Sequence, residues 1–250
     1  MSELSENFNL KEYMEKIVTD KLERFKLFTE WSDETKKEFK ELLSKLKEPF
    51  DKENETTKSK GDRLEKVVEF IINKTYFFEI YKNVRTKTNE IDEVIVLSDR
   101  GKQALETFGI SKELLQIDEE VFLGECKNYA SSLNVTYVGK FYSLLIATNV
   151  SFGIIFTQNG LTGDTDGYKD AYGLTKVLRI IEKYANNKEF YILTFTLEDY
   201  EKLLEGVSFF DLVKAKKLEL KLATDYHNFI KEKEHENREK LENIINEIRR

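Results

Sequence analysis

The chain has 250 residues, of which 40% are hydrophobic and 35% are charged, and its formal net charge is −7. This length is enough for one substantial core with accessory helices. No apolar run approaches the ~20 residues that a membrane span needs, so we expect no membrane partner. The acidic balance argues against a protein that coats nucleic acid through bulk charge, although it allows a local basic groove.

The cysteine and histidine content excludes two further classes. The single cysteine, Cys126, excludes an internal disulfide and is typical of a reducing compartment. With only two histidines, His227 and His235, a conventional structural zinc site is excluded as well. The first residues lack the basic and apolar regions of a secretory signal. We therefore expect a cytoplasmic protein.

The N-terminal part is predicted to be helical. Apolar residues recur at close to helical spacing over residues 8–47, with a break and an N-cap at Ser32 and Asp33. Pro49 ends the second helix, and the polar stretch 51–60 is the best candidate for a linker. We predict a helical N-terminal region with its linker over residues 1–58.

The pattern over residues 59–206 predicts an α/β domain with a mixed β-sheet core flanked by helices. Residues 207–250 are predicted to be a C-terminal helical extension, in which Leu241, Ile244, Ile245 and Ile248 form an apolar stripe. Within residues 59–206 the expected elements are helix 62–74, strands 76–82, 91–97 and 121–126, helix 135–148, strand 152–157, helix 168–185, strand 189–196 and helix 198–205.

Charged residues on two of these strands, 91–97 and 121–126, form a candidate site although they lie far apart in the sequence. Side chains alternate along a strand, so Glu125 and Lys127 point to one face and Cys126 points to the other. An acid and a lysine side by side at the end of an apolar strand are costly unless something binds there. If Asp92 on the neighbouring strand faces them, two carboxylates are available for a hard cation such as Mg²⁺, with one amine beside it.

This ordered set resembles the PD-(D/E)XK nuclease superfamily, whose motif places an acid on one strand and Glu-x-Lys on the next. The matching positions are Asp92 and Glu125-Cys126-Lys127. Glu65 stands where the superfamily often supplies a glutamate from the preceding helix. Residues 137–145 and 152–157 look like the helix and fourth strand of the Mrr-like restriction endonuclease branch, and the resemblance covers roughly residues 59–206.

The resemblance implies a restriction-endonuclease-like fold and a metal-dependent DNA endonuclease of restriction or anti-phage defence. Asp92 and Glu125 would hold Mg²⁺, for which Mn²⁺ can substitute, and the backbone carbonyl of Cys126 is a further candidate ligand. Lys127 would position water, and Glu65 is the remaining candidate catalytic residue. DNA is the expected partner. Because one site cuts one strand at a time, we also expect a homodimer.

The stretch between Asp92 and Glu125 departs from the pattern. Residues 98–119 look like an insertion that opens with a turn at 98–101. The partner of Glu125 therefore stays open between Asp92 and the nearer Asp118 or Glu120, although Asp92 opens a clean strand and is the better candidate. Glu90 would share a face with Asp92 and is either a second ligand or a solvated strand end.

Other residues have both a functional and a structural interpretation. Tyr129, Tyr137 and Tyr142 are candidates for base stacking or for helix packing, and Gln158 is a phosphate contact or a loop amide. A basic cluster ahead of the Asp92 strand is either a DNA groove or a set of solvated side chains; it comprises Lys58, Lys60, Arg63, Lys82, Arg85 and Lys87.

Two hypotheses from other functional classes stay open. The first is a non-catalytic DNA-binding or scaffolding protein of the same fold. The second is a helical interaction protein in which the central fold is a platform for the terminal helices.

Overall fold

A five-stranded mixed sheet is the centre of the fold, with strand order β1-β2-β3-β4-β5. The computed structural model describes residues 10–49, 57–85, 90–163 and 167–222. Strands β1 to β3 pair antiparallel, and β3 to β5 pair parallel, so the predicted mixed sheet is confirmed. The strands are β1 (Phe78–Arg85), β2 (Glu90–Leu97), β3 (Val121–Lys127), β4 (Phe152–Thr157) and β5 (Tyr191–Phe195).

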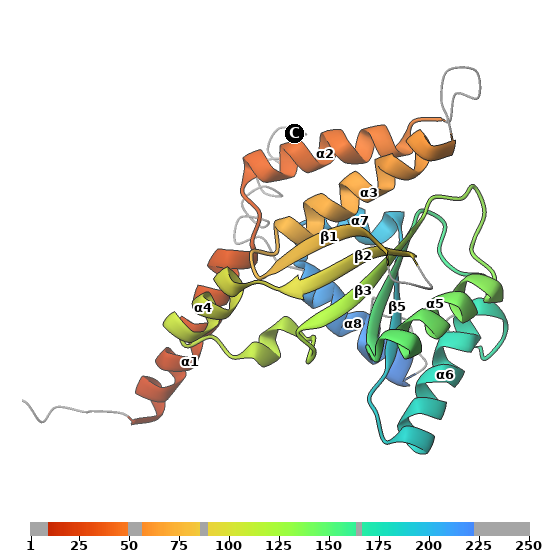
Figure 1. The fold of residues 1–250 in the computed structure, drawn as a ribbon. Helices are drawn as coiled ribbons and strands as arrows, with labels where there is room; N and C mark the ends of the chain where they lie inside the picture. The colour runs from red at the N-terminus through yellow and green to blue at the C-terminus, as the bar shows by residue number, and fades with distance from the viewer. Residues whose placement is uncertain (1–9, 50–56, 86–89, 164–166, 223–250) are drawn as a thin grey trace, which may run out of the picture.

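Helices flank the sheet, as Figure 1 shows. Helices α2 and α3 lie side by side, and α5 and α6 form a second packed pair. The helices are α1 (Leu10–Thr29), α2 (Asp33–Lys47), α3 (Thr57–Asn73), α4 (Asp99–Thr107), α5 (Val135–Thr148), α6 (Asp170–Asn186), α7 (Leu197–Leu204) and α8 (Phe209–Leu222), with a 3₁₀ helix η1 (Lys112–Leu115) after α4.

The alternation of strand side chains divides the apolar residues into two clusters, one on each face of the sheet. On β3, Phe122 belongs to the cluster formed with α2, α3, α7 and α8, whereas Leu123 belongs to the cluster formed with α5 and α6. Every residue of β4 is buried, because helices cover both faces of this parallel part of the sheet.

Side-chain caps explain where two of the helices begin. Ser32 precedes α2, and its side chain accepts a hydrogen bond from the backbone N–H of Thr35, so the predicted break in the N-terminal helix is confirmed. Asn134 caps α5 in the same way through the N–H of Thr136. This cap sets the start of the crossover that returns the chain from β3 to β4.

The insertion folds as α4 and η1, and its expected opening turn is instead a helix N-terminus. Ser98 Oγ accepts a hydrogen bond from Gly101 N at 3.0 Å and donates one to the carbonyl of Phe77 at 2.9 Å. A Cβ on Gly101 would lie 2.3 Å from the Phe77 carbonyl oxygen, so only glycine allows this close approach. The turn residues therefore dock the insertion onto the start of β1.

The N-terminal helices share the core of the sheet. Phe39, Leu43 and Leu46 of α2 are buried in the same cluster as Phe77. Helix α3 begins at Thr57 rather than at residue 62, which shortens the expected linker. The division of the chain at residue 58 stays a prediction, although α2 packs as part of the sheet's own core.

The C-terminal extension is described as far as the end of α8 at Leu222. The predicted stripe at residues 241–248 and both histidines lie outside the described residues. Within the described ranges, every helix is too short or too polar to traverse a lipid bilayer.

Candidate active site

The adjoining strands β2 and β3 bring three of the predicted site residues together. Asp92 Oδ2 lies 2.7 Å from Lys127 Nζ, and Glu125 Oε1 lies 2.9 Å from the same nitrogen. Asp92 Oδ2 also accepts a hydrogen bond from the backbone N–H of Cys126 at 3.3 Å. The three charged side chains are partly buried. Two carboxylates therefore converge on one cationic group.

The register of the antiparallel pair explains why Asp92 is the acid that faces Glu125. Glu93 pairs with Gly124, and continuing this register by one residue places Asp92 opposite Glu125. The insertion joins the two strands without disturbing this pairing.

The alternative acids point to other partners. Asp118 lies 3.7 Å from Lys217 on α8, and Glu120 lies 2.7 Å from Lys102 on α4. Both acids are therefore engaged by helices rather than by the Glu125–Lys127 pair.

Burial and mutual repulsion act on the ionisable groups of the site. Burial raises the pKa of Glu125, and the nearby charge of Asp92 raises it further, whereas Lys127 opposes both effects. Burial alone would lower the pKa of Lys127, but Glu125 and Asp92 outweigh it, so the pKa is raised. Lys127 therefore stays charged and holds the two carboxylates together.

Glu65 lies near this group but is not fixed to it. Burial, followed by the charge of Asp62, raises the pKa of Glu65, and the charges of Asp92 and Lys127 also act on it. Glu65 makes no hydrogen bond or ion pair with any other described residue. Its carboxylate is therefore available to a ligand at the edge of the site. It lines a groove with Gly61, Asp62, Asn83, Arg85 and Glu90.

Glu90 belongs to the rim of this groove. Its Oε1 lies 3.5 Å from Arg85 Nε, and both side chains are largely exposed. This geometry favours the solvated strand end over a second ligand.

Glu93 was not singled out from the sequence, yet it lies directly behind the site. It is 1% exposed, and its Oε2 has no hydrogen-bond partner among the described residues. Burial, opposed by a hydrogen bond from Cys126, raises the pKa of Glu93 to about 8. Its place between Ile91 and Ile95, on the inward-facing side of an alternating strand, was the signal that could have revealed it.

Thr157 is a second residue that the sequence did not single out. In the parallel register it pairs with Lys127, so the two side chains leave neighbouring strands on the same face. Its hydroxyl is buried and has no hydrogen-bond partner in the described part of the chain. Thr157 is therefore a buried neighbour of Lys127 on the next strand.

Side-chain amides form a hydrogen-bond network just beyond the C-terminal end of β3. Asn128 Nδ2 donates to the carbonyl of Lys60 at 2.6 Å, and Gln158 Nε2 donates to Asn128 Oδ1 at 2.8 Å. Gln158 Nε2 also donates to the carbonyl of Leu46 at 3.1 Å. The amide group of Gln158 is therefore used to tie α2 and α3 to the site strands, in agreement with its structural interpretation.

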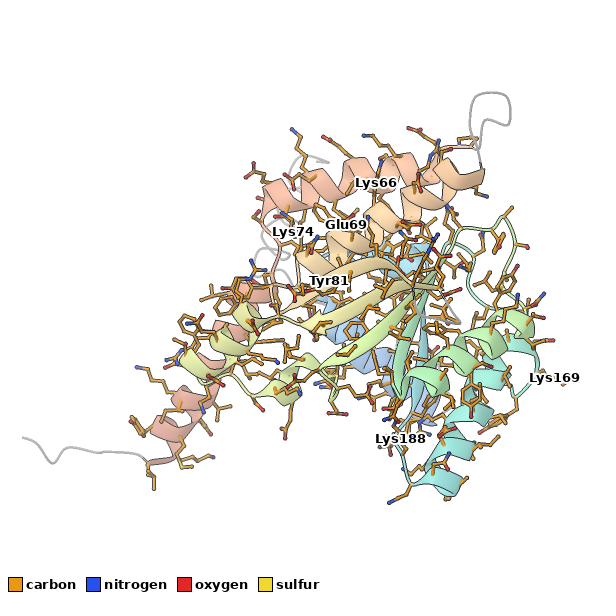
Figure 2. All side chains as sticks on the ribbon, viewed as in Figure 1. Lys66, Glu69, Lys74, Tyr81, Lys169 and Lys188 are labelled. Atoms are coloured by element: carbon orange, nitrogen blue, oxygen red, sulfur yellow. The ribbon has the colours of Figure 1, made fainter. Side chains whose placement is uncertain are left out.

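The predicted basic groove is partly occupied by contacts within the chain. Arg63 Nη1 donates to the carbonyls of Lys45 and Glu48 at 3.1 Å each. Lys82 Nζ lies 2.7 Å from Glu69 Oε2, and Figure 2 shows Glu69 on α3 above β1. Residue 87 and the side chain of residue 58 lie outside the described part of the structure.

The geometry is compatible with the Mg²⁺ that the family resemblance implies. Within the described ranges no group of three or more His, Cys, Asp or Glu side chains is arranged to hold a metal ion. Mg²⁺, however, commonly binds through one or two carboxylates and keeps several waters. Asp92 and Glu125 already converge on one cation, and both present hard oxygen donors. The chemistry of the two acids therefore fits such an ion, and the Cys126 carbonyl stays a predicted ligand.

Comparison with protein-family models, with curated proteins and with solved structures found no match to this chain.

Proposed function

We propose that the chain is a metal-dependent DNA endonuclease of restriction-endonuclease-like fold. The observation that carries the proposal is the convergence of Asp92 and Glu125 on Lys127 Nζ at 2.7 and 2.9 Å. Two acids and a lysine on adjoining strands of a mixed sheet are a donor set that can support metal-assisted phosphodiester hydrolysis. The motif resemblance points to the same chemistry and to a role in restriction or anti-phage defence.

Each side chain has a defined task in this mechanism. The chemistry that Mg²⁺ supplies at such a site is activation of water and neutralisation of charge on the phosphate. Asp92 and Glu125 provide the negative charge that holds the ion. Lys127 carries a positive charge that orients the attacking water or stabilises the charge developing on the phosphate oxygens. The raised pKa of Lys127 keeps that charge in place throughout the neutral range.

Glu65 has a secondary task in the proposal. Its carboxylate lies within the electrostatic range of Asp92 and Lys127 and has no fixed partner among the described residues. It is therefore suited to accept a proton or a hydrogen bond from water at the rim.

The test is direct. Purified protein is incubated with plasmid DNA and with modified and unmodified phage DNA, in Mg²⁺ and in EDTA. Cleavage in Mg²⁺ alone supports the proposal, and comparison of the phage DNAs shows whether base modification matters. Intact DNA under all conditions, with a correctly folded protein, contradicts it.

A second candidate is a non-catalytic DNA-binding or scaffolding protein of the same fold. The observation that favours it is that Lys127 already pairs with both carboxylates, so the three side chains can form an internal ion cluster without a ligand. Binding of DNA without cleavage, unchanged by Mg²⁺, would support this candidate.

The expected homodimer stays a prediction. It rests on the need for two sites to cut two antiparallel strands. Helix α1 exposes apolar residues toward solvent, among them Leu10, Met14, Ile17 and Leu22. Light scattering with and without DNA tests the assembly, and a monomer that nicks only one strand would contradict it.

A further inference from the structure

Two tyrosines lie beside the proposed catalytic group. Tyr129 follows Lys127 by two positions at the end of β3, and Tyr137 belongs to the first turn of α5. Their ring centroids are 5.3 Å apart and their planes are tilted by 45°. Tyr137 packs against the apolar cluster under α5, whereas Tyr129 is 43% exposed. Tyr137 is thus the fixed member of the pair, and Tyr129 presents aromatic surface to solvent.

The backbone that carries Tyr129 is firmly held. Its carbonyl accepts a hydrogen bond from Asn159 Nδ2 at 2.8 Å. Ser132 Oγ donates to the carbonyl of Asn159 at 2.7 Å, and Leu133 pairs with the backbone on both sides of Leu161. A ring on an anchored loop loses little conformational freedom when a ligand stacks on it, so the pair is organised before binding.

The tyrosine pair is within electrostatic range of the carboxylate site. The charges of Lys127 and Glu125 both act on the phenol of Tyr129. Lys140 follows Tyr137 by three positions, which places the two residues on neighbouring points of the α5 surface. The charge of this exposed lysine also acts on Glu125. Exposed aromatic surface and an exposed lysine therefore lie within electrostatic range of Glu125.

We propose that Tyr129 and Tyr137 form a stacking platform for an unstacked nucleobase next to the phosphate to be cut, with Lys140 contacting the nucleic-acid backbone. The identity of the ligand as a nucleic acid rests on the proposed function. The platform itself rests on the ring geometry, the anchored loop and the nearby lysine.

The chemistry of stacking predicts the form of the substrate. Every nucleobase has a π-face, so an aromatic platform binds bases with little regard to sequence. In a duplex these faces are covered by neighbouring bases. The platform therefore favours single-stranded, frayed or distorted DNA at the position next to the cut. Arrival of a base on Tyr129 would bring the adjoining phosphate toward Asp92 and Glu125.

The experiment uses the full chain and an oligonucleotide that carries 2-aminopurine, in EDTA so that no cleavage occurs. Stacking quenches the fluorescence of this base. We expect quenching with the wild type and with Tyr129→Phe, and a loss of affinity of about tenfold or more with Tyr129→Ala. Lys140→Ala should weaken binding and lower its salt dependence by about one counterion while leaving the quenching intact.

Tyr184→Ala is the matched control, because this tyrosine of α6 is 82% exposed and lies outside the platform. It should bind like the wild type. Wild-type affinity and quenching by Tyr129→Ala would overturn the inference, as would tighter binding to an unperturbed duplex than to a single strand.

The two proposals fail separately. If the protein stacks the base but cleaves no DNA in Mg²⁺, the nuclease proposal fails and the platform stands. If it cleaves DNA while Tyr129→Ala binds the probe unchanged, the platform fails and the nuclease proposal stands.

Discussion

Glu93 and Gly124 lie opposite each other on β2 and β3, and the side chain of Glu93 fills the space that a side chain at position 124 would need. A Cβ on Gly124 would lie 3.0 Å from Glu93 Oε2 and 3.1 Å from Glu93 Cβ. This contact is directly behind the Asp92–Glu125 pair. The size of residue 124 is therefore limited by a buried carboxylate on the neighbouring strand.

Gly124→Ala should destabilise the protein by about 1–3 kcal/mol, because the added methyl group overpacks a closed interface. Urea denaturation measures the change. In the double variant with Glu93→Ala, the contact with Oε2 is removed while the contact with Cβ remains, so the loss should be smaller than the sum of the two single losses. Strictly additive losses would show that the two residues do not compete for space.

Asp92→Asn should remove metal binding at the site, because an amide keeps the shape of the side chain and loses the charge that a hard cation needs. Calorimetry with Mn²⁺ measures this. Glu120→Gln is the matched control, since Glu120 pairs with Lys102 away from the site, and it should bind like the wild type. Unchanged binding by Asp92→Asn would remove Asp92 from the proposed ligands.

Removal of residues 1–50 should leave a protein that is insoluble or unfolded. Phe39, Leu43 and Leu46 would be lost from the core, and each is at most 2% exposed. Loss of buried side chains of this size costs about 2–5 kcal/mol each, so the summed loss is comparable with the whole stability of a typical domain. Expression and thermal unfolding of the fragment test this. A soluble fragment with a cooperative transition would show that the sheet and its remaining helices fold independently.

Tyr142 gives the stability of the protein a defined alkaline dependence. Its hydroxyl donates to Glu182, and this hydrogen bond raises the pKa of the phenol from 10 to about 12. A raised pKa in the folded state contributes stability that is complete below pH 10 and is lost as the pH rises toward 12. Tyr142→Phe should therefore be less stable than the wild type at pH 8, by a margin that shrinks above pH 10. An equal difference in the free energy of unfolding between the two proteins at pH 8 and above pH 10 would contradict this.

Local pattern was enough to predict most of the sheet and the facing of the site residues. β4 was recognisable because a short, wholly apolar run is bounded by polar residues. Asp92, Glu125 and Lys127 were recognisable because strand alternation decides which side chains share a face. The three side chains come together because β2 and β3 pair antiparallel in the register that the structure shows.

Long-range packing was not visible in the sequence. A polar stretch around residue 55 looked like a boundary, yet α2 buries its apolar face in the core of the sheet. Ser98 and Gly101 have the composition of a turn, whereas the bond between them caps a helix, and the contacts of both residues with Phe77 were not visible in the sequence. Glu93 was missed although it alternates with Ile91 and Ile95, because a charged residue normally faces water.

In the proposed Mg²⁺-dependent cleavage of DNA, Lys127 acts together with Asp92 and Glu125. The most direct measurement compares plasmid cleavage by the wild type, by Lys127→Ala and by Lys102→Ala, whose lysine pairs with Glu120 instead. We expect a loss of at least about a hundredfold in rate for Lys127→Ala, with DNA binding retained, and no loss for Lys102→Ala. Cleavage by Lys127→Ala at the wild-type rate would contradict it.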